Sequence, residues 1–167
     1  MTYRRDIGLL IVSVMLAMTP VARAQQATPA PVTQKAVAPR TILFIGNSFT
    51  QGAHSAARNW RAGTVTDLNG AGYGGVPALF KLFCDQMGLD YAVSLETQGG
   101  KTLGFHYDKR RALFDRSWDV VVLQELSVLN RDKPGDTAHY LRDVARLTSL
   151  FRARNPAVDI RLVAAWT

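Results

Sequence analysis

Apolar segments of strand length alternate with helix-like segments along most of this chain, and this order restricts the folds it can adopt. The patterns that predict strands lie at residues 41–46, 91–95, 119–123 and 160–165. The patterns that predict helices lie at residues 77–87, 102–114 and 136–154. Alternation with short connections predicts an α/β fold, in which helices cover both faces of a parallel sheet. The Gly-rich segment 63–75 interrupts the pattern as a long loop that could wall a pocket.

Residues 1–24 have the features of an export signal. Arg4 and Arg5 form a basic start, residues 7–17 are nearly all apolar, and Ala22-Arg23-Ala24 offers a small-residue cleavage site. The apolar run is shorter than the roughly 20 residues of a membrane-spanning helix, and a retained anchor is the alternative. Residues 25–40 are rich in Ala, Pro, Gln and Thr and predict a disordered linker, which leaves 41–167 as the folded domain. We therefore expect a secreted or periplasmic protein with no stable membrane span after signal removal.

Charge and cysteine content exclude several classes of function. The formal net charge is +7, but the basic cluster Lys109-Arg110-Arg111 has no interleaved aromatic residues and indicates a solvated face. We therefore expect no nucleic-acid partner. Cys84 is the single cysteine and lies among apolar residues, so it predicts a buried thiol and no internal disulfide. No Cys/His cluster has metal-ligand spacing, and we expect neither a metal nor another cofactor.

Polar residues and glycines follow the first three predicted strands at their carboxyl ends. Ser48 comes after the first strand, Gly100 lies in the turn after the second, and Gln124 ends the third. Parallel strands bring these ends to one edge of the sheet, where open α/β sheets bind ligands. Acyl transfer needs a nucleophile, a base and donors for the developing oxyanion, and Ser48, a glycine N–H and an amide meet two of these needs. Ordinary turn residues at three strand ends are the alternative interpretation.

Three blocks of sequence resemble the SGNH (GDSL-type) hydrolase superfamily, in an uncharacterised branch. They are Ile45-Gly46-Asn47-Ser48-Phe49-Thr50, Gly99-Gly100-Lys101-Thr102, and the strand from Trp118 to Glu125. The resemblance covers residues 41–167 and implies a flavodoxin-like three-layer α/β/α sandwich with a parallel sheet. It also implies hydrolysis of an acyl or acetyl ester, on a small molecule, lipid or polysaccharide. By the same resemblance, Ser48 is the nucleophile and one oxyanion donor, and Gly100 is the second donor.

The chain departs from the superfamily's pattern at two places. The third block lacks the usual asparagine donor, for which Gln124 or Asn130 could substitute. The Asp-x-x-His block that supplies the base is missing, so we expect a domain truncated after its fourth strand and poor or inert in catalysis.

Three histidines, His54, His106 and His139, are candidates to replace the missing base, although an exposed or capping histidine is the simpler interpretation of each. His54 could approach Ser48 from a polar loop, and His139 is predicted on a helix surface. His106, like Asn47, is a possible substrate contact at the pocket rim.

Two other functions stay open at the level of the sequence. A non-catalytic binding module could use the same scaffold. Gly70-Ala71-Gly72-Tyr73-Gly74-Gly75 matches G-x-G-x-x-G, with Glu96 as the later acidic residue, and would mark a dinucleotide-binding domain.

Overall fold

A computed structural model describes residues 38–164 of the chain. The predicted signal segment and nearly all of the predicted linker lie outside the described residues. The first strand begins at Arg40, one residue before the predicted start of the domain. No helix within residues 38–164 is long and apolar enough to cross a membrane.

A parallel sheet in the order β2-β3-β1-β4-β5 forms the middle layer. Its strands are β1 (Arg40–Gly46), β2 (Thr66–Asp67), β3 (Tyr91–Thr97), β4 (Val120–Gln124) and β5 (Asp159–Val163). Each pair of neighbouring strands is parallel, and Ile45 of β1 stands between Glu96 of β3 and Leu123 of β4. The chain therefore moves from the central β1 to one side of the sheet and crosses back to β4 on the other side.

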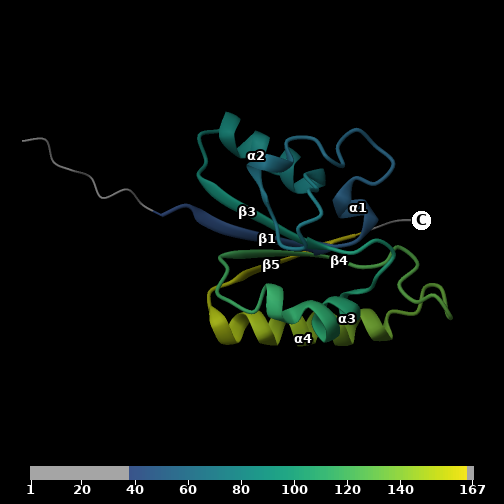
Figure 1. The fold of residues 1–167 in the computed structure, drawn as a ribbon. Coiled ribbons are helices and arrows are strands. Elements are labelled where there is room, and N and C mark those ends of the chain that lie inside the picture. The colour runs from purple at the N-terminus through teal and green to yellow at the C-terminus, as the bar shows by residue number, and fades with distance from the viewer. Residues whose placement is uncertain (1–37, 165–167) are drawn as a thin grey trace, which may run out of the picture. The chain divides into compact units, whose positions relative to one another are not determined.

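Helices cover both faces of this sheet, as Figure 1 shows: α1 and α2 lie on one face and α3 and α4 on the other. The helical elements are α1 (Ser48–Gln51), η1 (Ala62–Thr64), α2 (Gly75–Gln86), α3 (Leu103–Phe105), η2 (His106–Arg110), η3 (Arg111–Leu113) and α4 (Ala138–Arg154). The predicted α/β/α sandwich is confirmed. The predicted helices at 77–87 and 136–154 agree with α2 and α4 to within about two residues.

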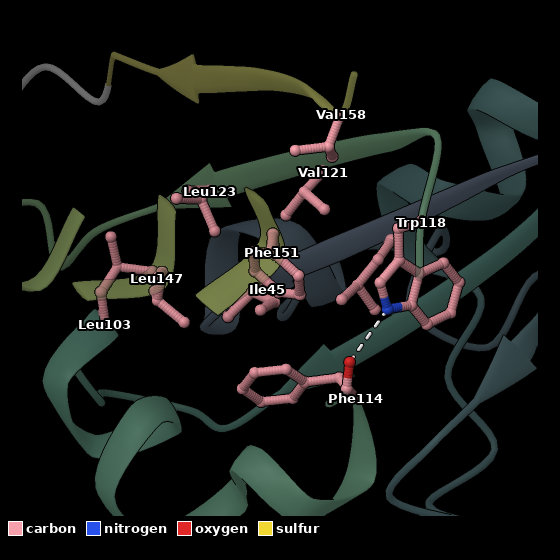
Figure 2. Packing of buried hydrophobic residues seen from close by; sticks show 10 residues of the cluster. Ile45, Leu103, Phe114, Trp118, Val121, Leu123, Leu147, Phe151 and Val158 are labelled. Carbon is pink, nitrogen blue, oxygen red and sulfur yellow. Dashed lines mark hydrogen bonds between the residues drawn. The ribbon is translucent and has the colours of Figure 1, made fainter. Parts of the chain in front are cut away.

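Strand β1 is buried on both faces, because its side chains alternate between two apolar clusters. Leu43 and Ile45 pack toward α3 and α4, and Ile42 and Phe44 pack toward α2. Figure 2 shows the larger cluster, in which Ile45 lies with side chains from β4, α3, α4 and the turns before β4 and β5. A strand with both faces covered has a continuous apolar sequence. The sequence of β1 therefore predicts this strand clearly.

The predicted helix at 102–114 is broken into three short pieces. It begins as α3, widens to a π turn in η2 and ends as a 3-10 turn in η3. Gly104 packs directly on α4, where an added Cβ would stand 2.5 Å from Asp143 Oδ2. The π turn contains His106, whose ring is buried against β3. These two tertiary contacts replace a regular helix, and π turns are frequent at functional sites.

The predicted loop at 63–75 contains η1 and the short strand β2, so the sheet has five strands where the sequence predicts four. Strand β2 pairs with β3 through Thr66 and Asp67. Two residues are too few to show a strand periodicity, so sequence patterns do not reveal β2.

Candidate functional site

Ser48 lies where the sheet topology favours a binding site. It is the first residue of α1, follows the carboxyl end of β1, and is half-buried. The chain leaves β1 toward β3 and later returns to β4 on the opposite side, so β1 ends at the topological switch point of the sheet. Within residues 38–164 the Ser48 hydroxyl and N–H make no hydrogen bond, which leaves both groups accessible to a ligand.

Asn47 joins the turns that follow β1, β3 and β4. Its Nδ2 donates to the carbonyl oxygens of Lys101 and Glu125, both at 3.3 Å, and its Oδ1 accepts from the N–H of Phe49. The side chain is 1% exposed, so every polar atom is used inside the protein. Asn47 therefore holds Ser48 against the other two turns, whereas the sequence suggested that it contacts substrate.

Gln124 supports the Ser48 turn from β4. Its Oε1 accepts from the N–H of Asn47 at 3.0 Å and from the N–H and Oγ1 of Thr50 at 3.3 and 2.9 Å. Its Nε2 donates to the carbonyl oxygen of Glu125. Gly46 is required beside this amide, because an added Cβ would stand 2.2 Å from Thr50 Oγ1. The amide of Gln124 is thus occupied in positioning the turn, which differs from its predicted role as a third oxyanion donor.

Gly100 and Asn130, both predicted as oxyanion donors, differ in whether they keep a hydrogen-bond donor free. Gly100 has a left-handed φ of 65°, which favours glycine, and its N–H has no partner among residues 38–164. Its carbonyl oxygen accepts from Arg131 Nη2 at 2.9 Å. Asn130 is bonded within its own loop, to the Asp136 carboxylate and to the N–H groups that follow it. Gly100 therefore keeps a free donor, and Asn130 does not reach back to Ser48.

His106 is buried and does not lie at the rim where the sequence placed it. Its Nδ1 is hydrogen-bonded to Glu96 Oε2, and both side chains are 0% exposed. Asn69 Nδ2 donates to the other oxygen of Glu96 at 3.1 Å, and Asn69 Oδ1 accepts from the N–H of Thr97 at 2.8 Å. His106 Nε2 is buried without a partner in the described part of the chain. Glu96 is the one acidic residue in the apolar strand β3. An acidic residue in such a strand is the sequence signal that could have indicated a buried partner such as His106.

Two further buried carboxylates lie on the α4 side of the rim. Burial raises the pKa of Glu125, although its carboxylate accepts from the N–H groups of Leu126 and Leu103. Burial also acts against ionisation of Asp143, but hydrogen bonds from Arg142 and Arg146 outweigh it and lower the pKa of Asp143. Glu125 is thus engaged with backbone N–H groups and Asp143 with two arginines of α4, and neither is hydrogen-bonded to Ser48.

His54 is the histidine that lines the same hollow as Ser48. The hollow has a volume of about 210 Å³ and includes Ser48, Phe49 and His54. His54 has a left-handed φ of 66°, so its backbone is held in an uncommon conformation. His139 is exposed on α4. No histidine in residues 38–164 is hydrogen-bonded to the Ser48 hydroxyl, so Ser48 has no engaged base within the described residues.

The Gly-rich loop does not have the free donors of a dinucleotide site. The carboxylate of Asp67 already accepts from the N–H groups of Asn69, Ala71 and Tyr73. Glu96, which would bind a ribose, is buried with His106. The preceding strand β2 is at the sheet edge and has two residues. Phosphate oxygens would have to displace Asp67, and the geometry therefore disfavours this function.

No cluster of His, Cys, Asp or Glu within residues 38–164 is arranged to hold a metal ion. Cys84 is buried in α2, as its apolar neighbours predict, and burial raises the pKa of its thiol.

Comparison with solved structures places the fold among known proteins. The chain is similar to TesA, with 19% identity, a TM-score of 0.50, and coverage of 74% of this chain and 59% of TesA. The chain shares its fold with TesA. It is also similar to a proposed SGNH hydrolase from Slackia heliotrinireducens, with 21% identity, a TM-score of 0.45, and coverage of 75% of this chain and 55% of that protein.

A family two carbohydrate esterase from Cellvibrio japonicus is similar at 18% identity and a TM-score of 0.46, with coverage of 76% of this chain and 43% of the esterase. The chain thus spans about half the length of these structures. Neither protein-family models nor curated proteins gave a match. The likeness to TesA concerns the fold alone.

Proposed function

We propose that this protein is a serine ester hydrolase of the SGNH type, with Ser48 as its nucleophile. The observation that carries the proposal is the junction made by Asn47, whose side chain ties the turns after β1, β3 and β4 together. This junction brings the turn that contains Ser48 next to the turn that contains Gly100, which supports the proposed roles of both residues. A nucleophile held next to unpartnered N–H groups is the arrangement that acyl transfer requires.

In the proposed reaction, Ser48 Oγ attacks the ester carbonyl carbon and the bond to the leaving alcohol breaks. The carbonyl oxygen takes the negative charge, and the N–H groups of Ser48 and Gly100 stabilise it. The Ser48 proton leaves with the alcohol, and water then releases the acid from the acyl-serine. A serine without an engaged base is a weak nucleophile, so we propose that this chain reacts slowly.

The surroundings of Ser48 support an ester with an apolar acyl group. Phe49 lines the small hollow of Ser48 and also a second, apolar hollow of about 330 Å³ that Phe44, Val76 and Val122 help to form. Apolar concave surface next to the reacting group is the usual way in which an acyl chain is bound.

Acylation of Ser48 by p-nitrophenyl acetate tests this proposal. We expect slow release of p-nitrophenol and an acetyl group on the peptide that contains Ser48, detected by mass spectrometry. Ser48→Ala should abolish both signals. Ser127→Ala, which removes a half-buried hydroxyl after β4, is the matched control and should leave them unchanged.

The variants also separate the alternatives. If the acetyl adduct and the rate are the same in Ser48→Ala as in the parent chain, the hydrolase proposal fails and a non-catalytic binding module replaces it. If His54→Ala removes the Ser48-dependent rate while the protein stays folded, His54 is the base. A rapid, Ser48-dependent rate would contradict the expected slow reaction.

Export to the periplasm or the medium is part of the proposal. The basic start, the apolar run and Ala22-Arg23-Ala24 support it, and all three lie outside the described residues. The amino-terminal sequence of the mature protein would test the cleavage site after Ala24.

A further inference from the structure

A polar pocket of about 340 Å³ adjoins the Ser48 rim on the β3 side. Gln51, one helical turn after Ser48 in α1, forms one part of its wall. Gly99, the neighbour of Gly100, and Asn69 of the Gly-rich loop form other parts of the wall. Residues three apart on a helix lie about 5–6 Å from one another, so a ligand at Ser48 can extend into this pocket.

Arg58 and Arg110 bring positive charge to this pocket without an acidic partner. Among residues 38–164 neither guanidinium has a carboxylate within 4.0 Å, whereas Arg146 and Arg154 each form ion pairs. Arg58 Nη2 donates to the Tyr73 hydroxyl at 2.6 Å and its guanidinium lies 4.6 Å from the centre of that ring. This contact holds one guanidinium at the pocket wall and leaves its remaining N–H groups available.

Arg110 has an unpartnered donor at the same pocket. Its Nε is buried and has no hydrogen-bond partner among the described residues. A buried donor left without a partner is unfavourable, so such an atom can mark the place of a ligand. Arg110 is the last residue of the π turn η2 and lines the pocket together with Thr97 of β3.

The acidic groups nearest to the pocket are already engaged. Asp67 accepts from N–H groups of its own loop, and Glu96 is bonded to His106 and Asn69. No carboxylate lines the pocket itself. The wall is completed by neutral polar groups, among them the buried pair of Gln51 and Thr97, joined at 3.2 Å. The pocket therefore combines two cationic side chains with a wall of neutral polar groups.

We propose that this pocket binds an anionic group, a carboxylate or a phosphate, carried by the ester that Ser48 attacks. This inference rests on the proposed function and adds the class of substrate. Guanidinium groups match the planar carboxylate and the phosphate with paired N–H donors, and hydrogen bonds to charged acceptors are stronger than neutral ones. The substrate would place its acyl group near Phe49 and its negative charge between Arg58 and Arg110.

Binding to the full chain with Ser48→Ala tests the inference without turnover. Calorimetric titration compares butyryloxyacetate, whose carboxylate is on the alcohol part of the ester, with propyl butyrate, a neutral ester of similar size. We expect binding of the anionic ester alone, and about tenfold weaker binding in Arg58→Gln and in Arg110→Gln, since each removes a charge-assisted contact. Arg152→Gln removes one exposed charge from α4 and should leave the Kd unchanged.

Inorganic phosphate used as a competitor distinguishes the two anions. Displacement of butyryloxyacetate by phosphate supports a site for either oxyanion, and no displacement supports a carboxylate site. Equal Kd values in the parent, Arg58→Gln and Arg110→Gln proteins, with unchanged circular dichroism, would overturn the inference. Loss of binding in Arg152→Gln as well would show attraction by net charge and would also overturn it.

The two proposals fail in different ways. Ser48-dependent acylation with no preference for anionic esters leaves the hydrolase proposal standing and removes the anion pocket as a substrate site. Arginine-dependent binding of butyryloxyacetate without any acylation of Ser48 removes the hydrolase proposal and leaves an anion-binding pocket.

Discussion

Single side chains decide how the rim around Ser48 is built. Asn47 and Gln124 are polar residues in buried positions, and each has its donors and acceptors satisfied by neighbouring turns. Sequence patterns placed both residues at the correct edge of the sheet. They could not assign the roles, because the direction of an amide depends on partners that lie more than 50 residues away in the chain.

Replacing Gln124 by methionine tests its positioning role. Gln124→Met keeps the length of the side chain but leaves the N–H groups of Asn47 and Thr50 without an acceptor. Because each unsatisfied buried group costs about 1–3 kcal/mol, we expect the free energy of unfolding to fall by about 2 kcal/mol or more. Urea unfolding of the parent chain and of Gln124→Met measures this difference in free energy. Gln98→Met, at a half-buried position whose side chain makes no such contacts, is the control, and an equal loss in both variants would contradict the assignment.

At the scale of elements, contacts between strands and helices explain where the predicted boundaries hold and where they do not. Strand β1 and helix α4 carry strong local patterns and end close to the predicted residues. The segment 103–113 carries a helical pattern, but Gly104 must fit against Asp143 and His106 must reach Glu96, so it forms three different turns. Local preference is outweighed there by tertiary contacts.

Asp119 fastens the start of β4 to β1, and its effect should depend on pH. The hydrogen bonds from the backbone and the hydroxyl of Thr41, at 2.7 and 2.8 Å, lower the pKa of Asp119. A lowered pKa in the folded state adds stability above the unfolded pKa of about 3.9, and this stability is lost as the pH falls through the folded pKa. We expect Asp119→Asn to lower the free energy of unfolding by about 1 kcal/mol at pH 7.

Urea unfolding at several pH values tests the direction in which the contribution of Asp119 to stability changes with pH. The difference between the parent and Asp119→Asn should shrink as the pH falls below about 4. Asp132→Asn, at an exposed carboxylate, is the control and should give no such trend. A difference that grows on acidification would be inconsistent with a lowered pKa of Asp119.

At the scale of the described domain, the central strand couples the two helical layers. The same strand β1 supplies Leu43 and Ile45 to one apolar cluster and Ile42 and Phe44 to the other. Neither cluster can lose its packing without exposing a face of β1. We therefore expect the two layers to unfold together.

Probes on opposite faces of the sheet test this coupling. Trp118 is buried in the cluster next to α4, and Cys84 is buried in α2 on the other face. Trp118 emission, with the other two tryptophans replaced by phenylalanine, and reactivity of the Cys84 thiol should change at one urea concentration. Exposure of Cys84 at a clearly lower concentration would show that the α2 layer opens independently.

Sequence patterns predict the order of the main strands and helices and the position of Ser48 after the central strand. Both follow from local periodicity and from the rule that parallel strands end at one edge. The polar groups that meet at this edge are known from the three-dimensional packing alone: Asn47 meets two distant turns, and Glu96 meets His106. The same packing brings Arg58 and Arg110 to one pocket. Hydrogen bonds and ion pairs between distant segments depend on how layers pack, and local patterns contain no information on that packing.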